Sequence, residues 1–285
     1  GLCSTSPNRY RIPMESAASE RHLPLPRFLG VVHLRPLPGS PGFDGDLDRI
    51  FEAAERDAAA LLEGGAHGII VENFGDLPFR PGRVDSETVA AMALCLDRVR
   101  RIVGEELTLG VNVLRNDALS ALGLCAATGA CFIRVNVHTG AAVTDQGLIQ
   151  GQADESLRLR AALFPDPARR PALLADVHVK HATPLGDSEI GLAAGDTYRR
   201  GAADGLIVSG TGTGAGVNLA DLKRVRQAVP EAPIWIGSGF TPETAAALLS
   251  HADGAIVGTW LKQGGQLAAP VDAARVREVA AIFRG

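Results

Sequence analysis

The sequence predicts a single domain with the (β/α)8, or TIM-barrel, fold. Eight short apolar runs alternate with eight longer segments from Phe28 to Gly285, and these 258 positions match the usual barrel size of about 250 residues. In addition, the runs Ile234–Gly237 and Ala255–Gly258 each end in a glycine that a hydroxyl residue follows. A barrel places phosphate-binding backbone N–H groups after its seventh and eighth strands. A doubly wound open sheet, the rival fold, seldom has eight equal units.

Turn and cap residues mark the elements in order. Asp46 can cap the first helix, Gly64-Gly65 closes it, and Pro242 stands in the first turn of the seventh helix. The expected strands are Phe28–Leu34, Gly68–Glu72, Leu107–Leu114, Cys131–Val137, Leu173–Lys180, Gly205–Ser209, Ile234–Gly237 and Ala255–Gly258. The expected helices are Leu47–Glu63, Ser86–Val103, Asp117–Ala127, Glu155–Leu163, Ile190–Arg200, Leu219–Ala228, Thr241–Leu249 and Val271–Phe283. We expect residues 1–27 to be a poorly ordered extension and residues 28–285 to form the barrel.

Composition restricts the partners. The net charge of −4 gives no electrostatic reason to expect nucleic acid, and no apolar stretch approaches the roughly 20 residues of a membrane span. Four cysteines without metal-ligand spacing predict a reduced, cytoplasmic protein. We expect a homo-oligomer that binds a phosphorylated small molecule, with peripheral membrane association left open.

Side chains alternate along a strand, so one parity faces the helices and the other faces the barrel lumen. The outward parity is apolar throughout, for example at Val32, Val71 and Val111. The inward parity carries most of the polar residues, and it gives the candidate site. The candidates for chemistry are Glu72, His33, His178, Lys180 and Asp176, and the candidates for substrate binding are Asn112, Arg134, Asn136 and Ser209.

These residues permit several kinds of chemistry. Lys180, one of only three lysines, could be a Schiff-base amine or an electrostatic clamp, with Glu72 as general base and His33 or His178 as acid. A buried ion network that pairs Asp176 and Glu72 with Arg134 and Lys180 is the structural alternative. No cofactor is predicted; a divalent metal held by His33, Glu72, Asp176 and His178 is a competing assignment.

Two glycine turns are candidates for phosphate binding. Gly237-Ser238-Gly239 leads into the N-terminus of a helix, and Gly258-Thr259 follows the neighbouring strand. The alternative is that these glycines only permit tight turns. The run Gly210–Ala215 fits a dinucleotide pattern, but no acidic residue follows at the spacing that would hold a ribose, so we interpret it as a phosphate or substrate loop. Long segments after three strands, 73–84, 139–154 and 181–189, are expected to cover the site.

Several motifs together resemble the BtpA family over residues 28 to about 265. They are the runs 30–41, 71–76, 110–117, 132–136, 144–147 and 176–181, with the final glycine pairs. The resemblance implies a ribulose-phosphate-binding type of barrel. It also implies a link to photosystem I biogenesis, because the family is named after a cyanobacterial factor for that process, associated peripherally with thylakoids. Relatives occur beside sugar-uptake genes in non-photosynthetic bacteria, and the resemblance implies no catalytic residues.

Two hypotheses follow from the sequence. The first is an enzyme, of isomerase, lyase or aldolase type, acting on a phosphosugar or nucleotide-like compound by proton transfer or carbonyl chemistry. The second is a non-catalytic assembly or regulatory factor for a membrane complex such as photosystem I.

Overall fold

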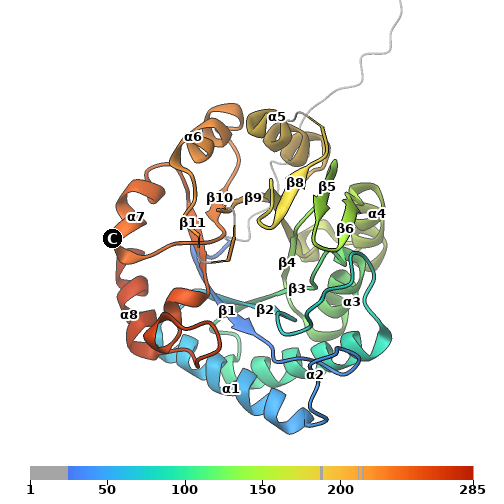
Figure 1. Ribbon diagram of the computed structural model, residues 1–285, viewed down its shortest axis with the longest axis vertical. Coiled ribbons are helices and arrows are strands. Elements are labelled where there is room, and N and C mark those ends of the chain that lie inside the picture. The colour runs from blue at the N-terminus through green and yellow to red at the C-terminus, as the bar shows by residue number, and fades with distance from the viewer. Residues whose placement is uncertain (1–24, 187–188, 211, 214, 285) are drawn as a thin grey trace, which may run out of the picture.

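The computed structural model describes residues 25–186, 189–210, 212–213 and 215–284. Within them, eight parallel strands close a barrel in the order β1-β11-β10-β9-β7-β4-β3-β2, which confirms the predicted fold. The barrel strands are β1 (Phe28–His33), β2 (Gly68–Glu72), β3 (Thr108–Asn112), β4 (Phe132–Val135), β7 (Ala172–Val177), β9 (Gly205–Val208), β10 (Ile234–Ile236) and β11 (Gly254–Val257). Helices surround them as a ring (Figure 1).

The ring follows the expected succession of helices. Its members are α1 (Leu47–Gly64), α2 (Ser86–Val103), α3 (Ala118–Thr128), α4 (Ala153–Leu163), α5 (Ile190–Gly195), α6 (Leu219–Ala228), α7 (Pro242–Leu249) and α8 (Ala273–Ile282). Asp46 caps α1 by accepting from the Arg49 N–H at 3.2 Å, and Thr241 and Thr244 form a capping box at α7. None of the helices in the described ranges is long and apolar enough to cross a membrane.

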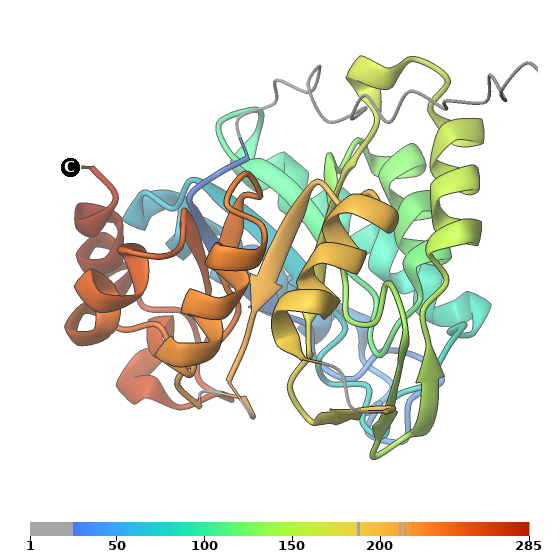
Figure 2. The same ribbon diagram turned by 90° about the horizontal axis from the view of Figure 1, so that it is seen from above.

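A small antiparallel sheet lies at the C-terminal end of the barrel. It consists of β5 (Ala141–Thr144), β6 (Gly147–Gln150) and β8 (Ala182–Pro184), in the order β6-β5-β8. Figure 2 shows it at the end toward which the barrel strands run. The sequence predicts no strand in segments 139–154 and 181–189. They are partly a sheet, which ties the segment after β4 to the segment after β7.

The barrel has an inner and an outer core, as the predicted alternation requires. The outer core packs the outward residues of the strands against the helices. The inner core fills the lower lumen with Leu29, Val31, Ile70, Phe132, Leu174, Ile207, Trp235 and Ile256. Glycines make room for the two large rings: a Cβ at Gly110 would lie 2.3 Å from the Phe132 ring, and one at Gly254 would lie 2.5 Å from Trp235 Nε1. Large and small inward residues therefore interdigitate.

Two boundaries differ from the sequence prediction. Residues 1–24 of the expected extension lie outside the described ranges, but Pro26 already belongs to the barrel floor, where its carbonyl accepts from Trp235 Nε1 at 2.9 Å. The fifth barrel strand ends at Val177 and not at Lys180, because His178 adopts a positive φ of 52°. The alternation rule therefore does not extend through His178 and Lys180.

Candidate functional site

Asp176 is the centre of a buried polar network above the inner core. Its carboxylate accepts from Arg134 Nε and Nη2, both at 2.8 Å, from Asn136 Nδ2 at 3.0 Å and from Ser209 Oγ at 3.1 Å. The bidentate pairing with Arg134 fixes the guanidinium plane. Asp176 is predicted above as a catalytic candidate, but both of its oxygens are occupied, so its visible role is to position Arg134 and Asn136.

Glu72 joins the same network from β2. Its Oε1 accepts from Asn112 Nδ2 at 2.9 Å and lies 3.5 Å from Arg134 Nη1, while its Oε2 is 4.0 Å from His33 Nε2. The strand register explains the grouping, because His33 pairs with Glu72 and Glu72 with Asn112 across β1, β2 and β3. The predicted ion network therefore exists around Arg134. It does not include Lys180.

A cavity of about 240 Å³, here called the mouth cavity, opens above this network. Glu72, Asn112, Arg134 and Asn136 form its floor, Lys180 and Arg115 contribute cations, and Phe74 and Phe79 contribute aromatic surface. Asp145, from the turn between β5 and β6, and His181 complete the lining. A carboxylate, amides and cations in one concave, partly apolar space are typical of a small-molecule site.

Lys180 is the chemically distinctive residue of the mouth cavity. Its ammonium group makes no hydrogen bond or ion pair with any residue in the described ranges. Burial lowers the pKa of Lys180 below its usual value of 10.5, and the nearby Arg134 lowers it further, against the opposing charges of Glu72 and Asp176. A lysine of this kind has a larger neutral, nucleophilic fraction near neutral pH.

His33 is held in its neutral form. Burial lowers the pKa of His33 to about 3, with smaller contributions from Lys262 and Lys180. Its ring lies against Phe74, with 4.7 Å between the ring centroids, and a Cβ on Gly258 would lie 2.8 Å from His33 Cε1. A neutral imidazole cannot act as an imidazolium acid at pH 7.

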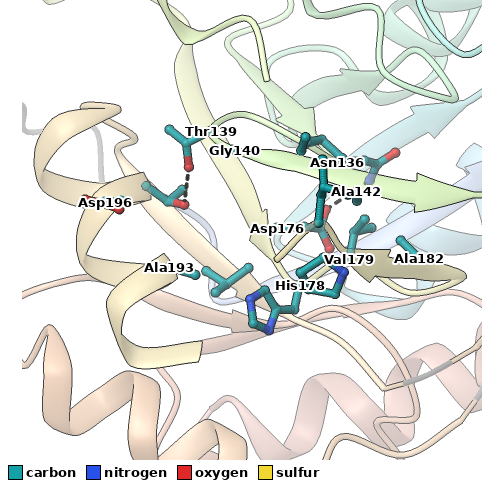
Figure 3. Close-up of a pocket in the computed structure, with 16 residues that line it drawn as sticks. Asn136, Thr139, Gly140, Ala142, Asp176, His178, Val179, Ala182, Ala193 and Asp196 are labelled. Atoms are coloured by element: carbon teal, nitrogen blue, oxygen red, sulfur yellow. Dashed lines mark hydrogen bonds between the residues drawn. The ribbon is translucent and has the colours of Figure 1, made fainter. Parts of the chain in front are cut away.

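His178 lies in a different cavity. This second cavity, of about 150 Å³, lies between the barrel rim, the small sheet and α5. It shares Asn136 with the mouth cavity, and Asp176 lines the second cavity alone. Figure 3 shows the His178 ring extending away from Asp176 and Asn136. The positive φ at His178 turns its side chain out of the inward row, so His178 and Lys180 line separate spaces.

The glycine turns at β10 and β11 contact other parts of the chain. Ser238 Oγ accepts from the Gly210 N–H at 2.8 Å and donates to the Ala215 carbonyl at 3.0 Å, and a Cβ at Gly239 would lie 2.5 Å from that carbonyl oxygen. Among the described residues, the linings of the two cavities do not include Gly237, Ser238, Gly239, Gly258 or Thr259. Their phosphate-binding role stays a prediction, and close packing also accounts for the glycines.

The four residues of the alternative metal assignment do not gather at one point. In the described part of the chain, no three His, Cys, Asp or Glu side chains are placed so that they could hold a metal ion. Asp176 is paired with Arg134, and His178 belongs to the second cavity.

The sequence reasoning missed Arg115 and the asparagines that shape the rim. Arg115 lies beyond β3, where strand alternation no longer applies, and its Nη2 donates to the Lys180 carbonyl. Asn73 donates to the Leu114 carbonyl at 3.2 Å and accepts from the Leu114 N–H at 2.7 Å, and Asn116 bridges to Val137 in the same way. These residues belong to the runs 71–76 and 110–117, which the sequence interpretation used only for the family resemblance. The signal that could have identified them as rim residues is that they are polar and directly follow a strand.

Fold and site together define a (β/α)8-barrel protein with a charged, ligand-sized cavity at the C-terminal ends of its strands. Solved structures confirm the fold: phosphoribosyl anthranilate isomerase from Thermococcus kodakaraensis matches with a TM-score of 0.52 at 15% identity, covering 91% of this chain and 99% of that one. CdNal from Clostridium difficile matches with a TM-score of 0.55 at 12% identity, covering 91% of this chain and 76% of that one.

The chain belongs to the BtpA family, whose model matches residues 26–284. It is 48% identical to the photosystem I biogenesis protein BtpA of Synechocystis sp. over 87% of this chain and 84% of that protein. An uncharacterized protein of Pyrococcus horikoshii is 43% identical over 90% and 95% of the two chains, and a Caenorhabditis elegans protein described as mitochondrial is 31% identical over 88% and 90%.

Proposed function

We propose that this protein is an enzyme that acts on a small phosphorylated compound carrying a carbonyl group, and that the mouth cavity is its active site. The observation that carries the proposal is the presence of Lys180 and Glu72 in one cavity, with the Lys180 amine unpaired among the described residues. Lys180 is partly buried, and a network devoted to stability would pair such a cation, because a desolvated charge without compensation is destabilising.

The chemistry follows from the state of each group. The neutral Lys180 amine attacks the substrate carbonyl carbon, and the adduct loses its hydroxyl group as water. One proton taken up from solvent in this step leaves the imine nitrogen protonated. Glu72, held by Asn112 and Arg134, then takes a proton from the carbon next to the imine carbon, whose C–H electrons move toward the nitrogen. This sequence serves isomerase, lyase and aldolase reactions alike.

Borohydride trapping tests the proposal. The protein is incubated with glyceraldehyde 3-phosphate, dihydroxyacetone phosphate, ribose 5-phosphate or ribulose 5-phosphate, reduced with sodium borohydride, and digested for mass spectrometry. Because the chain has only three lysines, the modified position is unambiguous. We expect reduction to fix the compound on Lys180 and not on the exposed Lys223.

Two variants sharpen the test. Lys180→Met should abolish trapping, and Lys223→Met, the matched control on α6, should leave it unchanged. Absence of label on Lys180 with all four compounds, or equal labelling of Lys223, would contradict the proposal.

The name of the Synechocystis relative favours a second candidate, a non-catalytic factor in the biogenesis of a membrane complex. Expression of this chain in a Synechocystis strain that lacks that relative distinguishes the enzyme from the non-catalytic factor. If the wild-type chain restores photosystem I, a scaffold role predicts that Lys180→Met and Glu72→Gln restore it equally. An enzyme role predicts that both variants fail while remaining folded.

A further inference from the structure

Arg115 occupies an unusual position in the mouth cavity. It follows β3, where its backbone N–H donates to the Arg80 carbonyl at 3.1 Å and its Nη2 donates to the Lys180 carbonyl. Its side chain lines the cavity, although only 4% of the residue is exposed. Arg115 is therefore held at its backbone and at its guanidinium group, and its side chain lines a space large enough for a small molecule.

The other buried cations have carboxylate partners, and Arg115 does not. Arg134 is paired with Asp176 at 2.8 Å, Arg160 with Asp204 at 2.6 Å, and Lys262 with Asp57 at 2.6 Å. No ion pair joins Arg115 to any carboxylate of the described residues. Burial holds the pKa of Arg115 below its ordinary value, as expected when a cation is desolvated without a close counter-ion.

The free donors of Arg115 match an oxyanion. A guanidinium has five N–H donors in one plane, and the bond to the Lys180 carbonyl uses only one of them. The remaining donors allow the bidentate contact that arginine makes with phosphate, and a phosphate monoester supplies the missing negative charge. Arg115 and Lys180 line the same cavity of about 240 Å³, so one small molecule can present an anion to Arg115 and a carbonyl to the Lys180 amine.

The glycine turns offer less space for the same group. The direction of a Cβ at Gly239 is filled by the Ala215 carbonyl, and that at Gly258 by the His33 ring. Ser238 already uses its hydroxyl to hold the segment after β9. The Cβ side of both turns is therefore closed by protein atoms, and within the described ranges neither turn lines one of the two cavities.

We infer that Arg115 is the anion-binding residue of the mouth cavity and receives the phosphate of the substrate, in place of the turns at β10 and β11. This inference rests on the proposed function for the nature of the substrate. It assigns specificity for phosphorylated over unphosphorylated compounds to Arg115, while Lys180 contacts the carbonyl.

Calorimetric titration with inorganic phosphate tests the assignment directly. Loss of a charge-assisted contact should weaken phosphate binding about 10- to 100-fold in Arg115→Gln. Arg115→Lys, which keeps the charge but loses the planar fork, should fall between this variant and the wild type. Thr259→Val, at the turn after β11, and Arg35→Gln, which removes an exposed arginine, should bind phosphate as the wild type does. Circular dichroism and melting of each ligand-free variant verify the fold.

Phosphate binding that survives in Arg115→Gln but is lost in Thr259→Val would overturn the inference, as would a wild-type protein that binds no phosphate. Borohydride trapping separates this failure from failure of the proposed function. With unphosphorylated glyceraldehyde, Lys180 should be labelled equally in the wild type and in Arg115→Gln. With glyceraldehyde 3-phosphate, labelling at low concentration should fall about 10- to 100-fold in Arg115→Gln only. If Arg115→Gln is labelled by glyceraldehyde 3-phosphate as strongly as the wild type, the role of Arg115 is refuted. If no protein is labelled by either compound, the role of Lys180 is refuted.

Discussion

Replacing Asp176 by asparagine should reduce the stability of the whole barrel. The substitution keeps the shape of the side chain but removes the charge that pairs with Arg134, itself buried, at 2.8 Å. Removing one partner of a buried ion pair costs about 3–5 kcal/mol, because the remaining charge is left without compensation. Glu72 offsets only part of this cost, since its Oε1 is 3.5 Å from Arg134. The melting temperature should therefore fall by roughly 6–20 °C.

Urea unfolding followed by circular dichroism measures the effect, and Asp97→Asn is the matched control. The Asp97–Arg101 pair is 2.7 Å apart, but its side chains are 50% and 75% exposed. Its loss should cost about 0.3–0.5 kcal/mol. Replacing Asp176, Arg134 and Glu72 together by leucine, methionine and glutamine should recover most of the lost stability, because no charge of the network is then left without a partner. If Asp176→Asn costs no more than the surface control, the Arg134 charge is solvated and the description of the network is wrong.

The neutral state of His33 should make the free energy of unfolding depend on pH. Below pH 6.5 the unfolded chain binds a proton at His33, whereas the folded chain binds it only near pH 3. The free energy of unfolding should therefore decrease as the pH falls. Urea unfolding between pH 6.5 and 5 should show a slope up to about 1.4 kcal/mol per pH unit smaller in His33→Gln than in the wild type, and equal slopes would contradict the neutral state. Gly110→Ala should cost about 1–3 kcal/mol in the same assay, because its Cβ would lie 2.3 Å from the Phe132 ring. Adding Phe132→Leu should relieve that clash, and an unchanged loss would refute it.

The fold and the network around Arg134 were predictable because both follow from the period of two. A barrel strand is buried on both faces, so outward residues such as Val71 must be apolar and inward polar residues must meet one another. Glu72, Asn112, Arg134 and Asp176 all occur where alternation places them, and they form one connected group. The floor of the site is therefore readable from the sequence.

The rim was less predictable because it depends on backbone conformations that alternation does not encode. A positive φ at His178 breaks the row in which strand alternation places Asp176, His178 and Lys180. The β5–β6 hairpin was readable in principle, since Ala142 and Ile149 are paired and buried while Val143 and Leu148 face solvent. Arg115 follows a strand end, where only the folded chain shows which side chains meet.

Charge separates two roles within the lumen. At the floor of the mouth cavity, Asp176 and Glu72 compensate the charge of Arg134 and hold its side chain in place. Stability and positioning therefore account for these three buried charges. Above, Lys180 and Arg115 line the same cavity without a carboxylate partner among the described residues, and Asp145 at the rim is exposed. Folding alone does not favour two such cations, because each loses hydration and gains no direct ion pair within the described part of the chain; Glu72 and Asp176 act on them only from a distance. A ligand that brings negative charge and a carbonyl resolves this imbalance, since the phosphate compensates Arg115 and imine formation uses the amine of Lys180.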